Sequence, residues 1–519
     1  MTQGTYGKQR MERRISAVAR LALCCGVVLL QVALILFLTH FLYARAGVAY
    51  GVLKLIGAVV AVRLYSRSGS PSYKLSWMCL LLALPVAGML LFVLWGGTHQ
   101  AKTLSLRQVQ PIPEREDRIR ESRSNTVRLG KEHPEWGRVA AYLQKKELYL
   151  YRNTDVRYFG DGAEFLRDLT DHIAQAETYV FLEYYILAEG QIWDQLFSVL
   201  RERAACGVEV HIIFDDFGNI TRLSDEMLQK MQQAGLEVEV FNPVHKYINR
   251  MYFNFRDHRK IAVIDGRYAY TGGVNIADEY ANLVVRFGHW KDSGIRIEGE
   301  AAWGFAAQFL KMWKMIGRSM PNEDDYYRPR LEFQEGHGYC QPFFDGPINN
   351  PDNLVEDLYL QLIASAKRFL YITTPYYAVE DSIQKALCIA ADSGVDVRLL
   401  IPAVPDHKIT YLVAETYWGE LLRHGVKIYR YLPGFLHAKS VMVDREVALV
   451  GSTNMDYRTF QLHYECGALL YQTPAVEELL EDMDGIMEKS ERYGLHKWEG
   501  RPWYRRAAAL VMKLFAIWL

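Results

Sequence analysis

Two segments of the chain carry the same chemical groups at the same spacing. The first segment contains His258, Lys260, Asp265 and Asn275, and the second contains His437, Lys439, Asp444 and Asn454. In both segments the lysine, the aspartate and the asparagine follow the histidine by two, seven and seventeen residues. A spacing this long that is kept twice in one chain indicates an internal duplication.

These residue types indicate chemistry on a phosphate group. Two lysines and two side-chain amides make a polar, cationic pocket that suits an anion with several oxygens. One histidine can attack phosphorus, and the other can protonate the leaving alkoxide. Because the displacement is then split through a phosphohistidine, the pattern requires no metal and no other cofactor.

The local pattern around each histidine is typical of a β-strand. Residues two apart on a strand share a face, so the histidine and lysine of each segment project side by side. The aspartate falls on the opposite face, and Asp265-Gly266 is a strong hairpin signal. We therefore count Asp265 and Asp444 with the catalytic motif but expect a structural role for them. The returning strands, 268–271 and 447–450, should bring the substrate-binding amides of Asn275 and Asn454 beside the histidines.

The doubled motif resembles the active-site motif of the phospholipase D superfamily. Within that superfamily the chain resembles the bacterial cardiolipin synthases, from about Tyr158 to the C-terminus and in the apolar segment 77–97. Segments that carry this likeness include 254–260, 272–280, 290–292, 296–299, 309–313, 345–347, 374–376 and 454–460. Gly273 stands where the superfamily more often has serine, which suggests that the two halves play unequal roles.

Each histidine is expected to have a carboxylate that fixes its tautomer and stabilises the imidazolium. Members of the family place an acid at the position of Glu465 in the second half, and Asp292 is its counterpart in the first half. His463 and His289 lie close to these acids in the sequence, and we expect them to make local hydrogen bonds rather than take part in catalysis.

The remaining sequence predicts an α/β fold in two similar halves. Strands and helices alternate in the same order before each motif, which is typical of a sheet covered on both faces. The predicted helices are 163–176, 191–205, 224–234, 353–365, 382–393 and 409–424, and the predicted strands are 178–186, 208–214, 236–241, 369–373, 395–401 and 426–429. Two such α/β/α units related by a pseudo-twofold axis would share one active site at their interface.

The predicted domain boundaries follow composition. They are a membrane anchor at 1–97, a charged juxtamembrane linker at 98–140, a first phospholipase D-like domain at 141–335 and a second at 336–519. Apolar runs at 17–43 and 75–96 are long enough to span a bilayer, and basic residues before the first place the N-terminus in the cytoplasm. The run 48–64 carries Lys54 and Arg63. It is either a third span or an interfacial segment, and we choose two spans with a cytoplasmic catalytic part.

Three further segments have alternative interpretations. The linker 98–138 is either solvated or holds anionic headgroups through its arginines. The loop 244–255 is aromatic with interleaved cations, and it either packs on itself or dips into the membrane interface. The C-terminal segment 501–519 is expected to form an amphipathic helix that lies on the membrane or docks on the second half, and we favour the membrane.

Charge and cysteine content narrow the function classes. The 60 basic residues balance the 60 acidic ones, which weighs against a nucleic-acid partner. The seven cysteines are scattered and show no metal-ligand spacing, as expected for free thiols in a reducing compartment.

The resemblance therefore implies a multi-pass enzyme of the bacterial cytoplasmic membrane. We expect a phosphatidyltransferase that converts two phosphatidylglycerol molecules to cardiolipin and glycerol, with phosphatidylglycerol and other anionic lipids as partners. Superfamily analogy makes His258 the nucleophile and His437 the acid, although the sequence alone allows the reverse. A phospholipase D-type hydrolase and a transferase with another donor or acceptor lipid remain alternatives. The two intact motifs argue against a lipid-binding protein without catalysis, and the oligomeric state stays open.

Overall fold

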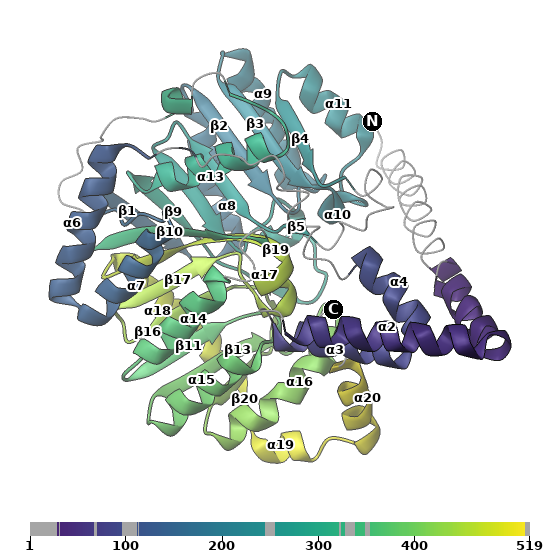
Figure 1. The fold of residues 1–519 in the computed structure, drawn as a ribbon. Coiled ribbons are helices and arrows are strands. Elements are labelled where there is room, and N and C mark those ends of the chain that lie inside the picture. The colour runs from purple at the N-terminus through teal and green to yellow at the C-terminus, as the bar shows by residue number, and fades with distance from the viewer. Residues whose placement is uncertain are drawn as a thin grey trace.

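The computed structural model describes residues 29–30, 32–66, 70–95, 112, 114–243, 255–320, 323–326, 338–347 and 353–513. Within these residues two α/β halves make up the body of the molecule. The first half, in teal, lies above the second, in green to yellow, and helices flank both sheets (Figure 1). The predicted fold class is confirmed.

The two sheets repeat one topology. The first contains β1 (Thr154–Phe159), β2 (Tyr179–Tyr184), β3 (Glu209–Asp215), β4 (Glu237–Phe241), β6 (Lys260–Ile264), β7 (Tyr268–Gly272) and β9 (Gly294–Gly299). The second contains β10 (Tyr339–Asp345), β11 (Phe369–Thr373), β13 (Asp396–Pro402), β14 (Lys427–Tyr431), β16 (Ser440–Val443), β17 (Val447–Gly451), β19 (His463–Tyr471) and β20 (Ser490–Tyr493). In the described chain their orders are β1-β9-β7-β6-β2-β3-β4 and β10-β19-β17-β16-β11-β13-β14-β20. Apart from β20 at the edge, the strands correspond one to one.

The helices that cover these sheets also correspond. The first half has α8 (Gly162–Ala174), α9 (Gln191–Ala205), α10 (Asp216–Asn219), α11 (Asp225–Gln233), α13 (Ala302–Met315) and the 3-10 turns η2 (Asp278–Ala281) and η3 (Glu323–Tyr326). The second half has α14 (Leu354–Ser365), α15 (Asp381–Asp392), α16 (Lys408–Arg423), α17 (Tyr457–Leu462) and α18 (Pro474–Glu488). Asp161 and Asn353 cap the equivalent helices α8 and α14, since each side chain accepts a backbone N–H three residues on. One continuous hydrophobic cluster draws side chains from both halves and joins them.

The expected charged linker is folded in its described part, and its residues 98–111 and 113 lie outside the described residues. From Glu116 it forms α6 (Glu116–Glu132), followed by α7 (Pro134–Lys145). Trp136 and Leu143 are buried in the shared core, and Gly130 and Gly137 let the two helices touch. Arg118 is buried beside Glu114, at 3.8 Å, so it does not face solvent or lipid. The linker interpretation is therefore wrong from residue 116 onward, because an apolar stripe is hidden among the charges.

The apolar N-terminal region differs from the expected pair of spans. Among the described residues, only α2 (Gly47–Tyr65) is long and apolar enough to cross a membrane; the helix 32–45 is shorter. Residues 17–28 and 31 of the predicted span 17–43 lie outside the described residues. The predicted span 75–96 is instead two helices, α3 (Pro71–Ala83) and α4 (Pro85–Trp95), folded back on each other.

The fold of that hairpin follows from two residues. Proline at position 85 has no N–H to continue the first helix, and at Gly88 any side chain would collide with the carbonyl of Leu80. Trp77 and Phe92 meet edge to face at 5.3 Å, a contact that a straight helix forbids. Ser72 at the start of α3 hydrogen-bonds to Glu380 (3.0 Å) and Tyr457 (2.7 Å), which fixes the hairpin to the second half.

The C-terminal segment packs on the second half through one of its faces. After α19 (Leu495–Glu499), α20 (Trp503–Lys513) lies along α16, and Arg505 pairs with the buried Glu415 at 2.8 Å. Trp503 and Leu510 point to solvent. Residues 514–519 and the aromatic loop from 244 to 254 lie outside the described residues.

Candidate active site

Two short strand pairs cross between the halves and set the position of both histidines. β5 (Arg256–Asp257), from the first half, pairs in parallel with the start of β19 in the second half. In return, β15 (Gly434–Leu436), from the second half, pairs in parallel with β8 (His289–Lys291) of the first. At the end of each pair the backbone N–H of the histidine donates to a backbone carbonyl of the opposite half. His258 donates to Tyr464 (3.0 Å), and His437 donates to Lys291 (2.7 Å).

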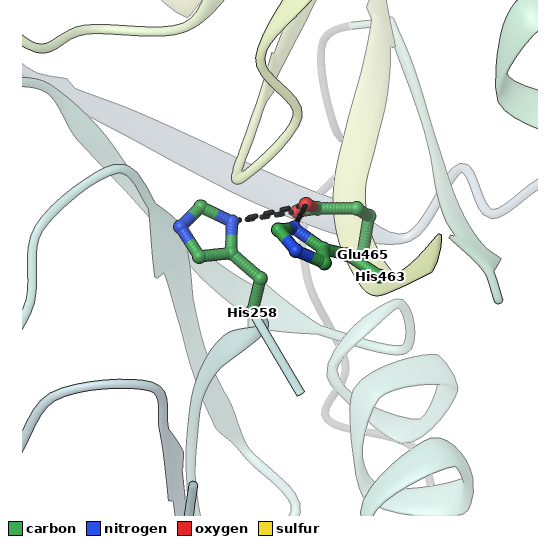
Figure 2. Close-up of side chains that lie close together, drawn as sticks. All are labelled: His258, His463 and Glu465. Atoms are coloured by element: carbon green, nitrogen blue, oxygen red, sulfur yellow. Dashed lines mark hydrogen bonds and ion pairs between the residues drawn. The ribbon is translucent and has the colours of Figure 1, made fainter. Parts of the chain in front are cut away.

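This exchange pairs each histidine with a carboxylate from the other half. The Nδ1 atom of His258 lies 3.0 Å from Glu465, and the Nδ1 atom of His437 lies 2.5 Å from Asp292 (Figure 2 shows the first pair). All four residues are buried. The sequence located one acid in each half, but local pattern alone did not show that the acids serve the opposite histidines. One composite site results, as expected.

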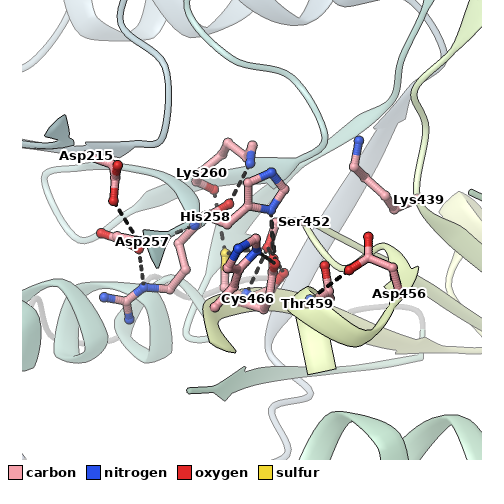
Figure 3. A network of polar contacts seen from close by, with 12 residues as sticks. Asp215, Asp257, His258, Lys260, Lys439, Ser452, Asp456, Thr459 and Cys466 are labelled. Atoms are coloured by element: carbon pink, nitrogen blue, oxygen red, sulfur yellow. Dashed lines mark hydrogen bonds and ion pairs between the residues drawn. The ribbon is translucent and has the colours of Figure 1, made fainter. Parts of the chain in front are cut away.

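The two lysines lie against the same centre. Lys260 and Lys439 are buried, and each Nζ donates to the carbonyl of the histidine in its own motif. Figure 3 shows them on either side of His258. Burial lowers the pKa of Lys260 to about 8 and that of Lys439 to about 7. The pair can therefore gain or lose positive charge near neutral pH.

Both histidines are neutral in the free site. Burial holds the pKa of His258 well below its usual range, and the charges of Lys260 and Lys439 lower it further. Burial and Lys439 lower the pKa of His437 to about 4, although Asp292 opposes the shift. Burial disfavours the ionised form of Asp292, but His437 and Lys439 still hold its pKa below the usual value. A neutral ring whose Nδ1–H donates to a carboxylate leaves Nε2 free to act as nucleophile or base.

The motif aspartates lie at the turns that follow β6 and β16. Asp265 accepts the backbone N–H groups of Thr178 (2.8 Å) and Tyr179 (3.0 Å) at the start of β2. Asp444 does the same for Arg368 and Phe369, both at 2.8 Å, at the start of β11. Among the described residues neither carboxylate hydrogen-bonds to a histidine, so both act on the scaffold.

The two asparagines differ. The amide of Asn275 accepts from the N–H of Ile186 (3.0 Å) and donates to the hydroxyl of Tyr280 (2.6 Å), so it already has partners. The buried Oδ1 atom of Asn454 has no hydrogen-bond partner among the described residues. Asn454 is therefore the better placed of the two to rearrange around a ligand.

The residue two positions before each asparagine also differs between the halves. Ser452 donates its hydroxyl to Glu465, the partner of His258. At the equivalent Gly273, an added Cβ would lie 2.1 Å from the Asp292 carboxylate. The absence of a side chain there lets Asp292 approach His437, which explains the glycine that the sequence singled out.

His463 is a site residue whose role the sequence did not predict correctly. Its ring lies 5.5 Å from that of His258, and its Nδ1 is 3.6 Å from Glu465 (Figure 2). Neither ring nitrogen makes the expected hydrogen bond within the described chain. His258, His463 and Glu465 are close enough to one another to hold a metal ion. His289 instead makes a local contact, 3.1 Å from the Tyr431 hydroxyl.

A buried ion network behind His258 was not foreseen either. Arg256 pairs with Asp215 at 3.0 Å, and Asp215 also accepts the N–H of Asp257 at 2.9 Å (Figure 3 labels both aspartates). Arg259 then bridges Asp257, at 3.2 Å, and Glu183. The charged residues on both sides of the histidine in the segment 254–260 are visible in the sequence. Their burial, which makes them an ion network, could not be predicted from it.

Comparisons with known proteins identify the family of the chain. A family model for the phospholipase D-like domain of cardiolipin synthase matches residues 169–313 and 359–487, and a phospholipase D-nuclease N-terminal model matches residues 52–97. An uncharacterized protein of Streptococcus mutans is 34% identical over 454 residues, which cover 85% of this chain and 95% of that protein. The cardiolipin synthase of Halalkalibacterium halodurans is 32% identical over 474 residues, covering 90% of this chain and 93% of that enzyme.

The chain belongs to the cardiolipin synthase family of the phospholipase D superfamily. A solved structure shares the fold of this family member: phosphatidylserine synthase of Haemophilus influenzae superposes with a TM-score of 0.55 at 15% identity, over 70% of this chain and 95% of that chain. Family membership and the composite site together confirm the resemblance that the doubled motif indicated.

Proposed function

We propose that this family member is a membrane phosphatidyltransferase that converts two phosphatidylglycerol molecules into cardiolipin and glycerol. The observation that carries the proposal is the convergence of two neutral histidines, each bonded to a buried carboxylate, between two lysines. Such a site suits two successive displacements at one phosphorus atom. The cardiolipin synthases among its relatives support the choice of lipid.

In the first step, Nε2 of His258 attacks the phosphorus of one phosphatidylglycerol. The bond to the headgroup oxygen breaks, and His437 gives that oxygen a proton, so glycerol leaves. In the second step, His437 takes the proton from a headgroup hydroxyl of another phosphatidylglycerol. That oxygen attacks the phosphohistidine, the N–P bond breaks, and His258 returns to its neutral form as cardiolipin is released.

The substrate itself supplies the charge that this cycle needs. In the free site burial, reinforced by the lysine charges, lowers the pKa of both histidines and favours their neutral forms, which suits a nucleophile but not an acid. A bound phosphodiester brings negative charge to Lys260 and Lys439 and so favours the imidazolium of His437, which Asp292 stabilises. Lys260, Lys439 and Asn454 hold the non-bridging oxygens as charge builds, and Asn275 keeps Tyr280 against His437.

We further propose a multi-pass anchor in the cytoplasmic membrane with the catalytic domains, 141–335 and 336–519, on the cytoplasmic side. The helix α2 supports at least one pass. Labelling of single cysteines placed on either side of α2, in intact cells and in open membranes, measures the number of passes and the side of the catalytic part.

The test of the function is turnover of labelled phosphatidylglycerol by the purified protein in the presence of a chelator. Cardiolipin with an equimolar amount of glycerol is the expected product. The variant His437→Ala should bind phosphatidylglycerol but make no cardiolipin. Phosphatidic acid alone would make water the acceptor and the protein a hydrolase. Equal product from the wild type and His437→Ala would contradict the proposed site.

A further inference from the structure

Five apolar residues are exposed together on three loops near His437. This rim patch consists of Leu283, Val284, Val285, Val404 and Leu432, which are between 39% and 79% exposed. Single exposed apolar residues are ordinary on protein surfaces, but a group on neighbouring loops marks a contact surface.

Hydrogen bonds tie the three loops to the strand pair that positions His437. The Asn282 amide donates to the carbonyl of Trp290 (3.0 Å) and accepts its N–H (2.7 Å), which fixes the loop that carries Leu283 to Val285. The N–H of His289 donates to Pro433, beside Leu432, at 3.0 Å. The N–H of Ala403, beside Val404, donates to Tyr431, also at 3.0 Å.

The rim patch therefore has a fixed position relative to His437. Trp290 forms the base of the first loop, and its ring lies 5.3 Å from that of His437. Tyr280, at the start of the same loop, packs edge to face on His437 at 5.5 Å. One layer of aromatic side chains thus separates the exposed loop from the histidine.

Exposed cations flank the apolar residues. Lys408 begins the helix after Val404, and the carbonyl of Lys489 accepts the N–H of Leu432 at 3.2 Å. Arg286 follows Val285 directly, and its partly exposed guanidinium also pairs with Glu279 at 2.8 Å. Apolar side chains that enter the acyl boundary, with cations at headgroup level, are the composition that binds an anionic bilayer.

We propose that the rim patch rests in the headgroup region of an anionic bilayer and presents the His437 side of the site to membrane lipid. This inference rests on the proposed function, because a lipid substrate gives the contact its purpose. It also agrees with the membrane-length helix α2, which keeps a bilayer within reach of the catalytic halves.

The first experiment compares two aspartate substitutions at exposed valines in the full chain. Val285→Asp lies in the patch, and Val127→Asp, at a 59% exposed residue of α6 far from α2 in Figure 1, is the matched control. In phosphatidylglycerol nanodiscs, turnover by Val285→Asp should fall about tenfold or more, while turnover of monomeric dihexanoyl-phosphatidylglycerol stays within about twofold. The control should match the wild type on both substrates. Equal turnover by Val285→Asp and the wild type in nanodiscs, or an equal loss on both substrates, would overturn the inference.

The second experiment measures contact without catalysis. A fluorophore is attached at Val285→Cys or at Val127→Cys in the full chain. Cys24, Cys25, Cys79 and Cys206 are replaced by serine so that they do not react with the label. Doxyl-labelled phosphatidylglycerol in the nanodisc should quench the first label and not the second. Absence of quenching at position 285 would overturn the inference. A wild type that makes no product from phosphatidylglycerol but shows this quenching would refute the proposed function alone.

Discussion

The two halves share a scaffold but surround their histidines with different chemistry. The rings of Tyr280, Trp290 and Phe435 lie 5.3 to 5.6 Å from that of His437 and make an aromatic box. His258 has Tyr185 at 5.0 Å on one side and His463 at 5.5 Å on another, and Glu465 takes a further bond from Ser452. Three aromatic rings surround His437, whereas one aromatic ring, a second histidine and a doubly hydrogen-bonded carboxylate surround His258.

The difference extends to the residues next to each histidine. Asp257 and Arg259 flank His258 and belong to the buried ion network, whereas Leu436 and Ala438 flank His437. Where Arg259 meets Glu183 in the first half, Thr373 bonds to Ser440 at 2.8 Å in the second. The duplicated strands kept their register while the second half replaced buried charges with apolar and hydroxyl groups.

This comparison suggests a division of labour. A rigid, hydrogen-bonded surrounding suits a nucleophile that must hold one position. An aromatic box with a single close carboxylate suits a histidine whose protonation follows the arrival of charge. On this basis we assign the nucleophile to His258 and proton transfer to His437.

The largest expected effect separates the two histidines. Both alanine variants should lose the overall transfer, by roughly 10² to 10⁴-fold or more. With phosphatidyl-p-nitrophenol, whose leaving group needs no proton, His437→Ala should still release a burst of p-nitrophenol and form a phosphoenzyme. His258→Ala should do neither. A burst from His258→Ala and none from His437→Ala would reverse the assignment.

The buried ion network should contribute more stability than its counterpart. Arg259→Met leaves Glu183 and Asp257 without their shared cation and should cost about 3–5 kcal/mol of unfolding free energy. Thr373→Val removes a neutral hydrogen bond and should cost only about 1 kcal/mol. Chemical unfolding in detergent measures both, and equal losses would remove this contrast between the halves.

The two lysines should lose charge at different pH. Their lowered pKa values, about 7 for Lys439 and about 8 for Lys260, mean that both are charged below pH 7 and that charge is lost as the pH rises. Binding of phosphatidylglycerol to inactive His258→Ala should therefore weaken by about tenfold between pH 6 and pH 9. Adding Lys439→Arg should remove more of this dependence than adding Lys260→Arg. Binding that does not change with pH would contradict the lowered pKa values.

The smallest effect concerns the glycine and serine that precede the asparagines. Gly273→Ala pushes a Cβ against Asp292 and should lower kcat about tenfold by moving that carboxylate from His437. Ser452→Ala removes one donor from Glu465 and should lower kcat only a few-fold. Steady-state kinetics on short-chain phosphatidylglycerol measures both. The reverse order would show that the hydroxyl matters more than the space.

Sequence pattern predicted the local structure well and the long-range structure poorly. The helix expected at 191–205 is α9 at the same bounds, and the strand expected at 369–373 is β11, because period and burial are local signals. The duplication predicted one shared site. The crossing of β5 and β15 into the opposite halves depends on contacts between distant segments, so the pairing of Asp292 with His437 could not be derived.

Two errors came from composition. The described part of the expected linker 98–138, from residue 116 onward, was expected to be solvated because its charges conceal the stripe that includes Leu129 and Trp136. The apolar run 75–96 was expected to be one span because hydropathy does not show that Pro85 and Gly88 fold it back on itself. In both segments the average hydropathy gave the wrong prediction, because the positions of a few individual residues determine the structure.

The most direct test of the composite site replaces each of its two carboxylates by the corresponding amide and repeats the burst assay. If Glu465 serves His258, Glu465→Gln should slow phosphoenzyme formation from phosphatidyl-p-nitrophenol. If Asp292 serves His437, Asp292→Asn should leave that burst intact and slow the reaction only with phosphatidylglycerol, whose glycerol must be protonated. The opposite result, a burst lost in Asp292→Asn and kept in Glu465→Gln, would contradict the pairing of each histidine with the other half.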